Sequence, residues 1–210
     1  MTPEEPRSEK PTAADADSRS ELRDVNDPKT LRALTHPVRL ALLEALALEG
    51  PLTATAAGEL IGESPTTCSF HFRQLAKYGF VEEAKTGPGR LRPWKIVKVG
   101  MRFSDITEDP ATSVAAKSLE RMVFERAMSR FATYMNSKAS FPKAWQEASQ
   151  NIETILWVTP AELDAVSQEV LEIFNRFFDR ISDSSARPEE SLPVEALMLT
   201  YPVRLPGGRQ

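Results

Sequence analysis

Cysteine and histidine are scarce in this sequence, which has one cysteine and two histidines among 210 residues. The single cysteine, Cys68, has no partner for an intramolecular disulfide. With one cysteine and two histidines, the chain also cannot form a zinc site of several cysteines. Long apolar runs are also missing, so no segment is expected to span a bilayer. The first residues carry charges and prolines where a secretory signal has an apolar stretch, and we therefore expect a cytoplasmic protein.

Motifs of enzymes are absent as well. The sequence contains no glycine-rich phosphate loop, no nucleophile elbow and no motif of paired carboxylates. Its two histidines, His36 and His71, both lie in the first half, where the patterns below indicate a binding surface. We therefore expect a protein that is not an enzyme and has no cofactor.

Three parts can be distinguished along the chain. Residues 1–24 hold three prolines, seven acidic and four basic residues, and Leu22 as the one large aliphatic residue. Such a segment cannot bury enough apolar surface to offset the entropy of ordering, so we predict a disordered tail. Residues 25–100 are dense in helix boundaries and end in a hairpin pattern, and residues 101–205 form a second unit.

Short helices with marked ends fill most of residues 25–100. Asp27 precedes Pro28 and Ser64 precedes Pro65, which pairs an N-cap residue with proline at the first helical position. Glycines follow the apolar stretches and mark helix ends. The predicted helices begin at Pro28, Pro37, Ala54 and Pro65, and the last three end before Gly50, Gly62 and Gly79.

Beyond these helices the apolar period changes to that of strands. Residues 80–84 and 94–99 are strand candidates, and the loop 85–93 between them is rich in glycine and arginine. This pattern predicts a β-hairpin with a basic tip.

The third and fourth predicted helices have the spacing of a helix-turn-helix, because residues 53–61 and 65–78 are joined by a tight turn at Gly62. On a helical wheel, one side of the second of these helices is apolar and the other is polar. The apolar side is expected to face the core with Leu60 and Phe80. It consists of Cys68, Phe72 and Leu75.

The polar side of this helix suits entry into the major groove of DNA. Hydroxyls in its first turn can reach base edges or phosphates, arginine can bind guanine through two hydrogen bonds, and lysine supplies charge for phosphates. The predicted hairpin adds basic residues. The candidate DNA contacts are Ser64, Thr66, Thr67, Ser69, Phe70, His71, Arg73, Gln74, Lys77, Arg90, Arg92 and Lys95.

Two segments of this half resemble ArsR-type winged helix-turn-helix regulators. Residues 31–43 are similar to the opening helices of that family, and residues 67–82 to its recognition helix and the turn into the wing. Residues 89–92 lie where the family has the glycine-arginine tip of its wing. The resemblance covers about residues 27–100 and implies a winged helix-turn-helix that binds double-stranded DNA. The matching positions are Ser69, His71, Phe72, Leu75, Gly79, Phe80 and Val81.

The distribution of charge agrees with a DNA-binding surface, although the whole chain has a net charge of −4. Residues 65–100 carry seven basic and two acidic side chains, a net charge of +5, and the rest of the chain carries −9. A basic face on an acidic protein is sufficient to attract phosphates. A basic hairpin alone could be merely solvated, but its position directly after a helix-turn-helix favours DNA contact.

The pattern departs from the metal-sensing members of this family. Residues 54–61, in the helix that often carries the cysteine pair of those members, contain no cysteine. Cys68 and His71 have a helical spacing, but two ligands do not complete a site and Cys68 lies on the inward side. We predict no metal site, with Cys68 as a small core residue.

The second half predicts a smaller α+β domain. Residues 114–136 show a long helix with apolar residues on two neighbouring faces, residues 141–149 a short helix, and Thr159 opens a capping box that starts another helix. Strands are predicted near residues 101–105, 152–158 and 196–201, in one sheet with the helices on one face.

Aromatic residues concentrate between positions 119 and 181, and two interpretations stay open. They form a core and a dimer interface, or they line a pocket for a small apolar effector. The apolar surplus of the long helix favours a homodimer, which would match a palindromic operator. The candidate pocket residues are Phe131, Trp145, Trp157 and Phe174.

Together these patterns predict an α+β protein with an N-terminal winged helix-turn-helix, made of a helical unit and a β-hairpin wing, in residues 25–100. A smaller C-terminal α+β domain of residues 101–205 would serve dimerisation. The predicted function is sequence-specific DNA binding by a homodimeric transcriptional regulator that senses no metal. An effector-gated regulator and a protein-interaction module without specific DNA binding are the alternatives.

Overall fold

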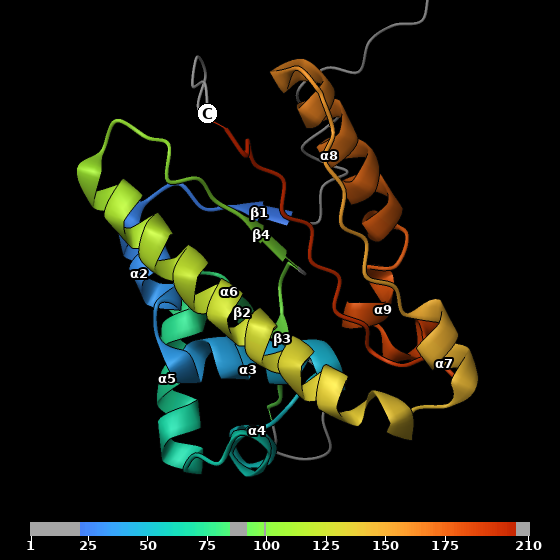
Figure 1. The fold of residues 1–210 in the computed structure, drawn as a ribbon. Coiled ribbons are helices and arrows are strands. Elements are labelled where there is room, and N and C mark those ends of the chain that lie inside the picture. Colours follow the sequence, from blue (N-terminus) through green and yellow to red (C-terminus); the bar gives the residue numbers. More distant parts are fainter. Residues whose placement is uncertain (1–21, 85–91, 99, 205–210) are drawn as a thin grey trace, which may run out of the picture.

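The computed structural model describes residues 22–84, 92–98 and 100–204. Helices dominate this part of the chain and two small two-stranded sheets accompany them, which confirms the predicted α+β class (Figure 1). The first half contains β1 (Leu22–Asp24), α2 (Pro28–Leu34), α3 (Pro37–Glu49), α4 (Ala54–Ile61), α5 (Pro65–Lys77), β2 (Val81–Glu83), β3 (Trp94–Ile96) and β4 (Gly100–Arg102). The second half contains α6 (Pro110–Ser137), η1 (Lys138–Ser140), α7 (Lys143–Ala148), α8 (Pro160–Asn175), α9 (Asp179–Ser182) and η2 (Ser184–Ala186).

Capping residues set the starts of α2 and α5 at the predicted positions, whereas the long helix α6 begins at Pro110, four residues before the predicted start. The Asp27 carboxylate accepts hydrogen bonds from the backbone N–H groups of Lys29 and Thr30, at 3.1 and 2.8 Å, where α2 begins. The Ser64 hydroxyl accepts one from the Thr67 N–H at 3.0 Å where α5 begins. Proline starts α2, α3, α5, α6 and α8, because its fixed φ suits a helix and its missing N–H would have no partner there.

An apolar core joins the helices of the first half to the beginning of α6. Its largest wholly buried side chains come mainly from α2, α3 and α5, and the Phe72 ring stacks on Trp94 of β3 with centroids 5.5 Å apart. Ala115, Ala116 and Leu119 of α6 belong to the same core. The predicted boundary near residue 100 therefore divides this core, and the start of α6 packs with the first half.

The predicted tail ends earlier than expected, because residues 22–24 form strand β1. This strand pairs in parallel with β4, with Leu22 opposite Gly100, and the Val25 N–H donates to the Arg102 carbonyl at 2.9 Å. Val25 is 2% exposed, so the segment adds a buried apolar side chain to the core. Residues 1–21 lie outside the described residues, and the remainder of the tail stays a prediction.

The predicted C-terminal sheet is wrong. Met101 lies in a strand, β4, but that strand pairs with β1 of the first half. Residues 152–158 and 196–201 are extended chain without strand pairing in the described structure. An alternating apolar pattern becomes a strand only where a neighbouring strand supplies backbone partners. The C-terminal part is helical instead, with extended connections (Figure 1).

Ion pairs join this C-terminal part to the first half. Glu44 of α3 binds Arg126 and Arg130 of α6, the latter at 2.6 Å, and Arg130 also binds Glu195 of the C-terminal segment. Burial acts to raise the pKa of Glu44, but the hydrogen bonds and charges of both arginines outweigh it and hold that pKa below its ordinary value. This ion-pair network connects α3, α6 and the C-terminal segment.

Candidate nucleic-acid interface

Helices α4 and α5 form the helix-turn-helix, and two glycines permit the turn between them. Gly62 ends α4 in the left-handed conformation, with φ of 73°. A Cβ at Gly58 would stand 2.5 Å from the carbonyl oxygen of Glu63, whose N–H donates to the Gly58 carbonyl at 3.0 Å. The missing side chain at Gly58 therefore permits the close approach of the turn to α4.

The inward side of α5 is packed as predicted. Cys68, Phe72 and Leu75 are each 0% exposed. Leu60 was expected to join them, and this prediction is wrong because its side chain is 55% exposed. Helix α4 buries its Gly58 side, and a residue two positions later points about 200° around the helix.

The outward side of α5 brings most of the predicted DNA contacts of this helix onto one surface. The helix contains two basic residues and no acidic residue. The aromatic side chain of Phe70, on the same side as these basic residues, is 53% exposed. Ser64, Thr66, Phe70, Arg73 and Lys77 are exposed, and Thr67, Ser69 and Gln74 are half-buried.

Local hydrogen bonds hold several of these side chains in place. The hydroxyl oxygens of Ser64 and Thr67 lie 2.8 Å apart at the helix start. Arg73 folds back along the helix, with its Nε donating to the Ser69 carbonyl at 3.2 Å and a terminal nitrogen to the Ser69 hydroxyl at 3.4 Å. These exposed contacts are weak, so a base or phosphate can replace them.

His71 does not share this surface. Its side chain is 8% exposed, and its ring lies 4.4 Å from that of His36, centroid to centroid. His36 caps α3, since its Nδ1 accepts from the Val38 N–H at 3.2 Å. Burial lowers the pKa of both imidazoles, and the charge of Arg39 lowers it further. The predicted DNA contact at His71 is therefore wrong, because the ring belongs to the packing of α5 on α3.

The predicted hairpin is present as the antiparallel pair β2 and β3. Arg90, at its predicted tip, lies outside the described residues and stays a prediction. Arg92 binds Glu83 and Lys95 binds Glu82, each at 3.0 Å in an exposed ion pair. Ion pairs this exposed are weak, so DNA phosphates can compete for both basic side chains.

Cys68 has the surroundings of a core residue. Burial, together with the charge of Glu63, raises the pKa of its thiol, which disfavours the thiolate that metals and oxidants require. Among the residues that the structure describes, no group of three or more His, Cys, Asp or Glu side chains is gathered for a metal ion.

A basic hollow adjoins α5, and the sequence motifs did not predict it. Lys29, Arg32 and Arg39 line it together with Gln74 and Tyr78, around a volume of about 250 Å³. A terminal nitrogen of Arg39 donates to the Arg32 carbonyl at 3.2 Å. In the sequence, this hollow is indicated only by three basic residues within residues 29–39, before the helix-turn-helix. The fold brings these three residues close to α5, and sequence spacing does not predict that.

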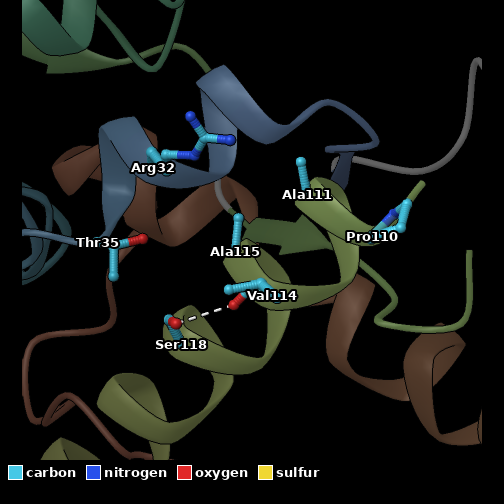
Figure 2. A pocket seen from close by; sticks show the side chains of 7 residues that line it. All are labelled: Arg32, Thr35, Pro110, Ala111, Val114, Ala115 and Ser118. Carbon is cyan, nitrogen blue, oxygen red and sulfur yellow. Dashed lines mark hydrogen bonds between the residues drawn. The ribbon is translucent and has the colours of Figure 1, made fainter.

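The four aromatic residues predicted to line an effector pocket differ in exposure. Trp157 is 90% exposed and cannot line an enclosed pocket, so the prediction is wrong for this residue. Phe131 is 39% exposed, and Trp145 and Phe174 are half-buried. A cavity of about 530 Å³ opens at a different place, between α2 and α6 (Figure 2). Its lining residues are Arg32, Thr35, Pro110, Ala111, Val114, Ala115 and Ser118.

Comparison with known proteins identifies the helix-turn-helix. A family model described as a helix-turn-helix domain matches residues 34–84, which include α3, α4, α5 and β2. No curated protein matches the sequence. In the described part of the chain, no helix is long and apolar enough to cross a membrane. The chain therefore contains a helix-turn-helix DNA-binding domain, and this domain indicates a role in transcription regulation.

Proposed function

We propose that this protein is a sequence-specific transcriptional regulator of the ArsR-like type, which binds double-stranded DNA as a homodimer and senses no metal. The outward side of α5 carries the proposal, because its exposed hydroxyl, aromatic and basic side chains occupy a helix without acidic residues. The second helix of a helix-turn-helix enters the major groove and contacts bases near its N-terminus.

The spacing along α5 divides the roles. Arg73 is the side chain we assign to base recognition, since a guanidinium can bind guanine O6 and N7 together. Ser69 and Thr66 lie one and two turns earlier, respectively, on the same side and would contact neighbouring base edges or phosphates. Phe70 would contact a thymine methyl, and Lys77 would neutralise a phosphate.

The basic hollow extends this surface toward the DNA backbone. Lys29, Arg32 and Arg39 are suited to phosphate oxygens beside the groove that α5 enters. Arg92 and Lys95 of the hairpin would contact phosphates on the wing side. Contacts of this kind fix the orientation of the protein without reading sequence.

The homodimer is supported by the apolar side of α6, which exposes Phe124, Met128, Phe131 and Met135. A single recognition helix covers one half-site, and two related half-sites on a palindrome require two copies. The absence of metal sensing is supported by Cys68, because its side chain is buried in the core and its raised pKa disfavours the thiolate that binds metals.

Selection of bound duplexes from a random pool tests the proposal, followed by titration of a selected and a random duplex at several salt concentrations. We expect the selected duplex to bind more tightly and its affinity to fall steeply as salt rises. Equal binding of both duplexes would contradict sequence-specific recognition. A duplex affinity that does not change with salt concentration, or no duplex binding at all, would favour a protein-interaction module.

Arg73→Ala is expected to weaken binding of the selected duplex by about 1–3 kcal/mol and to leave the random duplex nearly unchanged. Lys77→Ala should weaken both duplexes alike and reduce the salt slope by about 1. Lys143→Ala is the matched control, since it removes an exposed lysine that pairs with Glu147 at 3.5 Å on α7. An equal loss on both duplexes in Arg73→Ala would contradict its assigned role.

A second candidate function, gating by a small apolar ligand, is favoured by the cavity between α2 and α6. Both helices carry core residues of the DNA-binding half, so a ligand between them would change how that half is held. Benzoate is a suitable probe, because its ring fits apolar walls and its carboxylate suits Arg32. A benzoate-dependent change in duplex affinity that Val114→Trp abolishes would support gating, and an unchanged affinity would contradict it for this class of ligand.

A further inference from the structure

The second half of the described chain lacks a core of its own. Ala127, at 3% exposure, is its last buried residue, and the described residues from 128 to 204 include no buried one. Of the 25 large apolar residues that are exposed in the described chain, 19 lie between Val123 and Val203. Apolar surface on this scale marks an interface with another protein surface.

Helix α6 presents an apolar seam that consists of Phe124, Met128, Phe131 and Met135. These side chains are 42, 36, 39 and 53% exposed, respectively. Their spacing of four, three and four residues places them on one face of the helix. At about 100° per residue, this face points roughly opposite to Leu119, which is 0% exposed and packs in the core. The α6 seam is therefore directed away from the chain's own core.

Helix α8 and the residues after it repeat this spacing at Val166, Val170, Ile173 and Phe177, which we call the α8 seam. Ile173 and Phe177 are 47 and 49% exposed. Within the described chain, α8 has no extensive contact with another helix or strand, and Figure 1 shows it apart from α6. An isolated helix of 16 residues is marginal in water, so α8 requires a surface to pack on.

Charge indicates which surface that is. Helix α8 contains four acidic residues and no basic one, whereas α6 contains four basic and two acidic residues. Two copies of α8 would repel one another. Helix α6 adds no such repulsion, because Arg126 and Arg130 are already paired with Glu44 and Glu195 and the other two basic and two acidic residues of α6 balance. The α6 seam therefore offers α8 an apolar face of equal length without the charge repulsion that a second α8 would bring.

We propose that α8 of each chain packs on the α6 seam of a second copy, so that the two chains exchange their α8 helices. The inference rests on the proposed homodimer and adds which surfaces form it. The contact is made twice around a two-fold axis, which closes the assembly at two chains. The C-terminal end of α8 stays with its own chain, because α9 packs on α3 and Arg187 donates to the Leu48 carbonyl at 3.0 Å. The exchange therefore concerns the length of α8 before this anchor.

Two single-cysteine variants test the exchange. Met128→Cys places a thiol on the α6 seam and Ile173→Cys places one on the α8 seam, while the native Cys68 is wholly buried. An equimolar mixture of the two full-length variants is treated with a short bismaleimide, whose reach tolerates a register shift of one helical turn. We expect a covalent heterodimer in which mass spectrometry finds positions 128 and 173 joined.

Gln168→Cys is the matched control, because position 168 is exposed on the side of α8 opposite Val166. Mixed with Met128→Cys, it should give roughly tenfold less heterodimer than the Ile173→Cys mixture. Equal yields would overturn the proposal. A chain with both Met128→Cys and Ile173→Cys that closes into a crosslinked monomer, while the mixture stays unreacted, would also overturn it, because α8 would then pack on its own α6.

Sedimentation and duplex titration of the wild-type chain separate this inference from the proposed function. A dimer that prefers its selected duplex but yields no seam crosslink overturns the exchange and leaves the regulator standing. Seam crosslinks in a protein without duplex preference overturn the regulator and leave the exchange standing. A monomer at micromolar concentration overturns the exchange and the homodimer together.

Discussion

Gly58→Ala adds one methyl group where α4 meets the turn of the helix-turn-helix. In an ordinary helix interior this change stabilises a protein by about 0.5–1 kcal/mol, because glycine loses more backbone entropy on folding. At Gly58 the new Cβ would stand 2.5 Å from the Glu63 carbonyl oxygen, where real contacts essentially never fall below 3.0 Å. The backbone of Glu63 must therefore retreat by at least about 0.5 Å.

That retreat also lengthens the 3.0 Å hydrogen bond from the Glu63 N–H to the Gly58 carbonyl. Overpacking by one methyl group costs about 1–3 kcal/mol, and a weakened backbone hydrogen bond about 0.5–1.5 kcal/mol. After the gain in helix propensity is subtracted, we expect the free energy of unfolding to fall by about 1–3 kcal/mol.

Urea unfolding followed by circular dichroism measures this difference. Glu59→Ala is the matched control, since it places alanine at the next, exposed position of α4 and should change stability by less than about 0.5 kcal/mol. A Gly58→Ala protein as stable as wild type, or more stable, would refute the reasoning, because helix propensity would then outweigh the clash.

Burial lowers the pKa of His71 in the folded protein, so the unfolded chain binds a proton at a higher pH than the folded one does. The free energy of unfolding should therefore fall as pH drops below about 6.5. His71→Gln should flatten this dependence in urea titrations at several pH values; an unaltered slope would exclude His71 as its source. Glu44→Gln deprives Arg126 and Arg130 of their shared carboxylate and should lower stability by about 1 kcal/mol in thermal melts at neutral pH. The wild type should lose that contribution as pH falls through the lowered pKa of Glu44, and a variant as stable as wild type at neutral pH would show that the network contributes nothing. Arg39→Ala should weaken binding of specific and random duplexes alike by about 1 kcal/mol, and unchanged affinities would remove the basic hollow from the DNA interface.

Helix starts could be predicted because their signals are local. Asp27, Ser64 and Thr159 each accept hydrogen bonds from N–H groups two or three residues later, so the deciding contact lies within one turn. Helical spacing likewise separates buried Cys68 from exposed Phe70 on α5. These short-range relations specify both the order of the helices and most of the surface of α5.

Contacts between distant segments could not be predicted in the same way. Strand β1 depends on β4, whose Gly100 lies 78 residues after its partner Leu22. Residues 152–158 show the reverse case, since their strand-like pattern has no neighbouring strand in the described structure. The exposure of Leu60 and the burial of His71 depend on how α4 and α5 pack, which spacing along one helix does not specify.

Phe70 stands 53% exposed on the side of α5 that we assign to base recognition. In the major groove, the apolar feature available to such a ring is the methyl group on carbon 5 of thymine. Cytosine methylated at carbon 5 presents a methyl group at the equivalent place. On this assignment, the Phe70 ring makes DNA binding sensitive to cytosine methylation, which does not change the base sequence. A cytosine methyltransferase would then change which DNA sites this protein occupies.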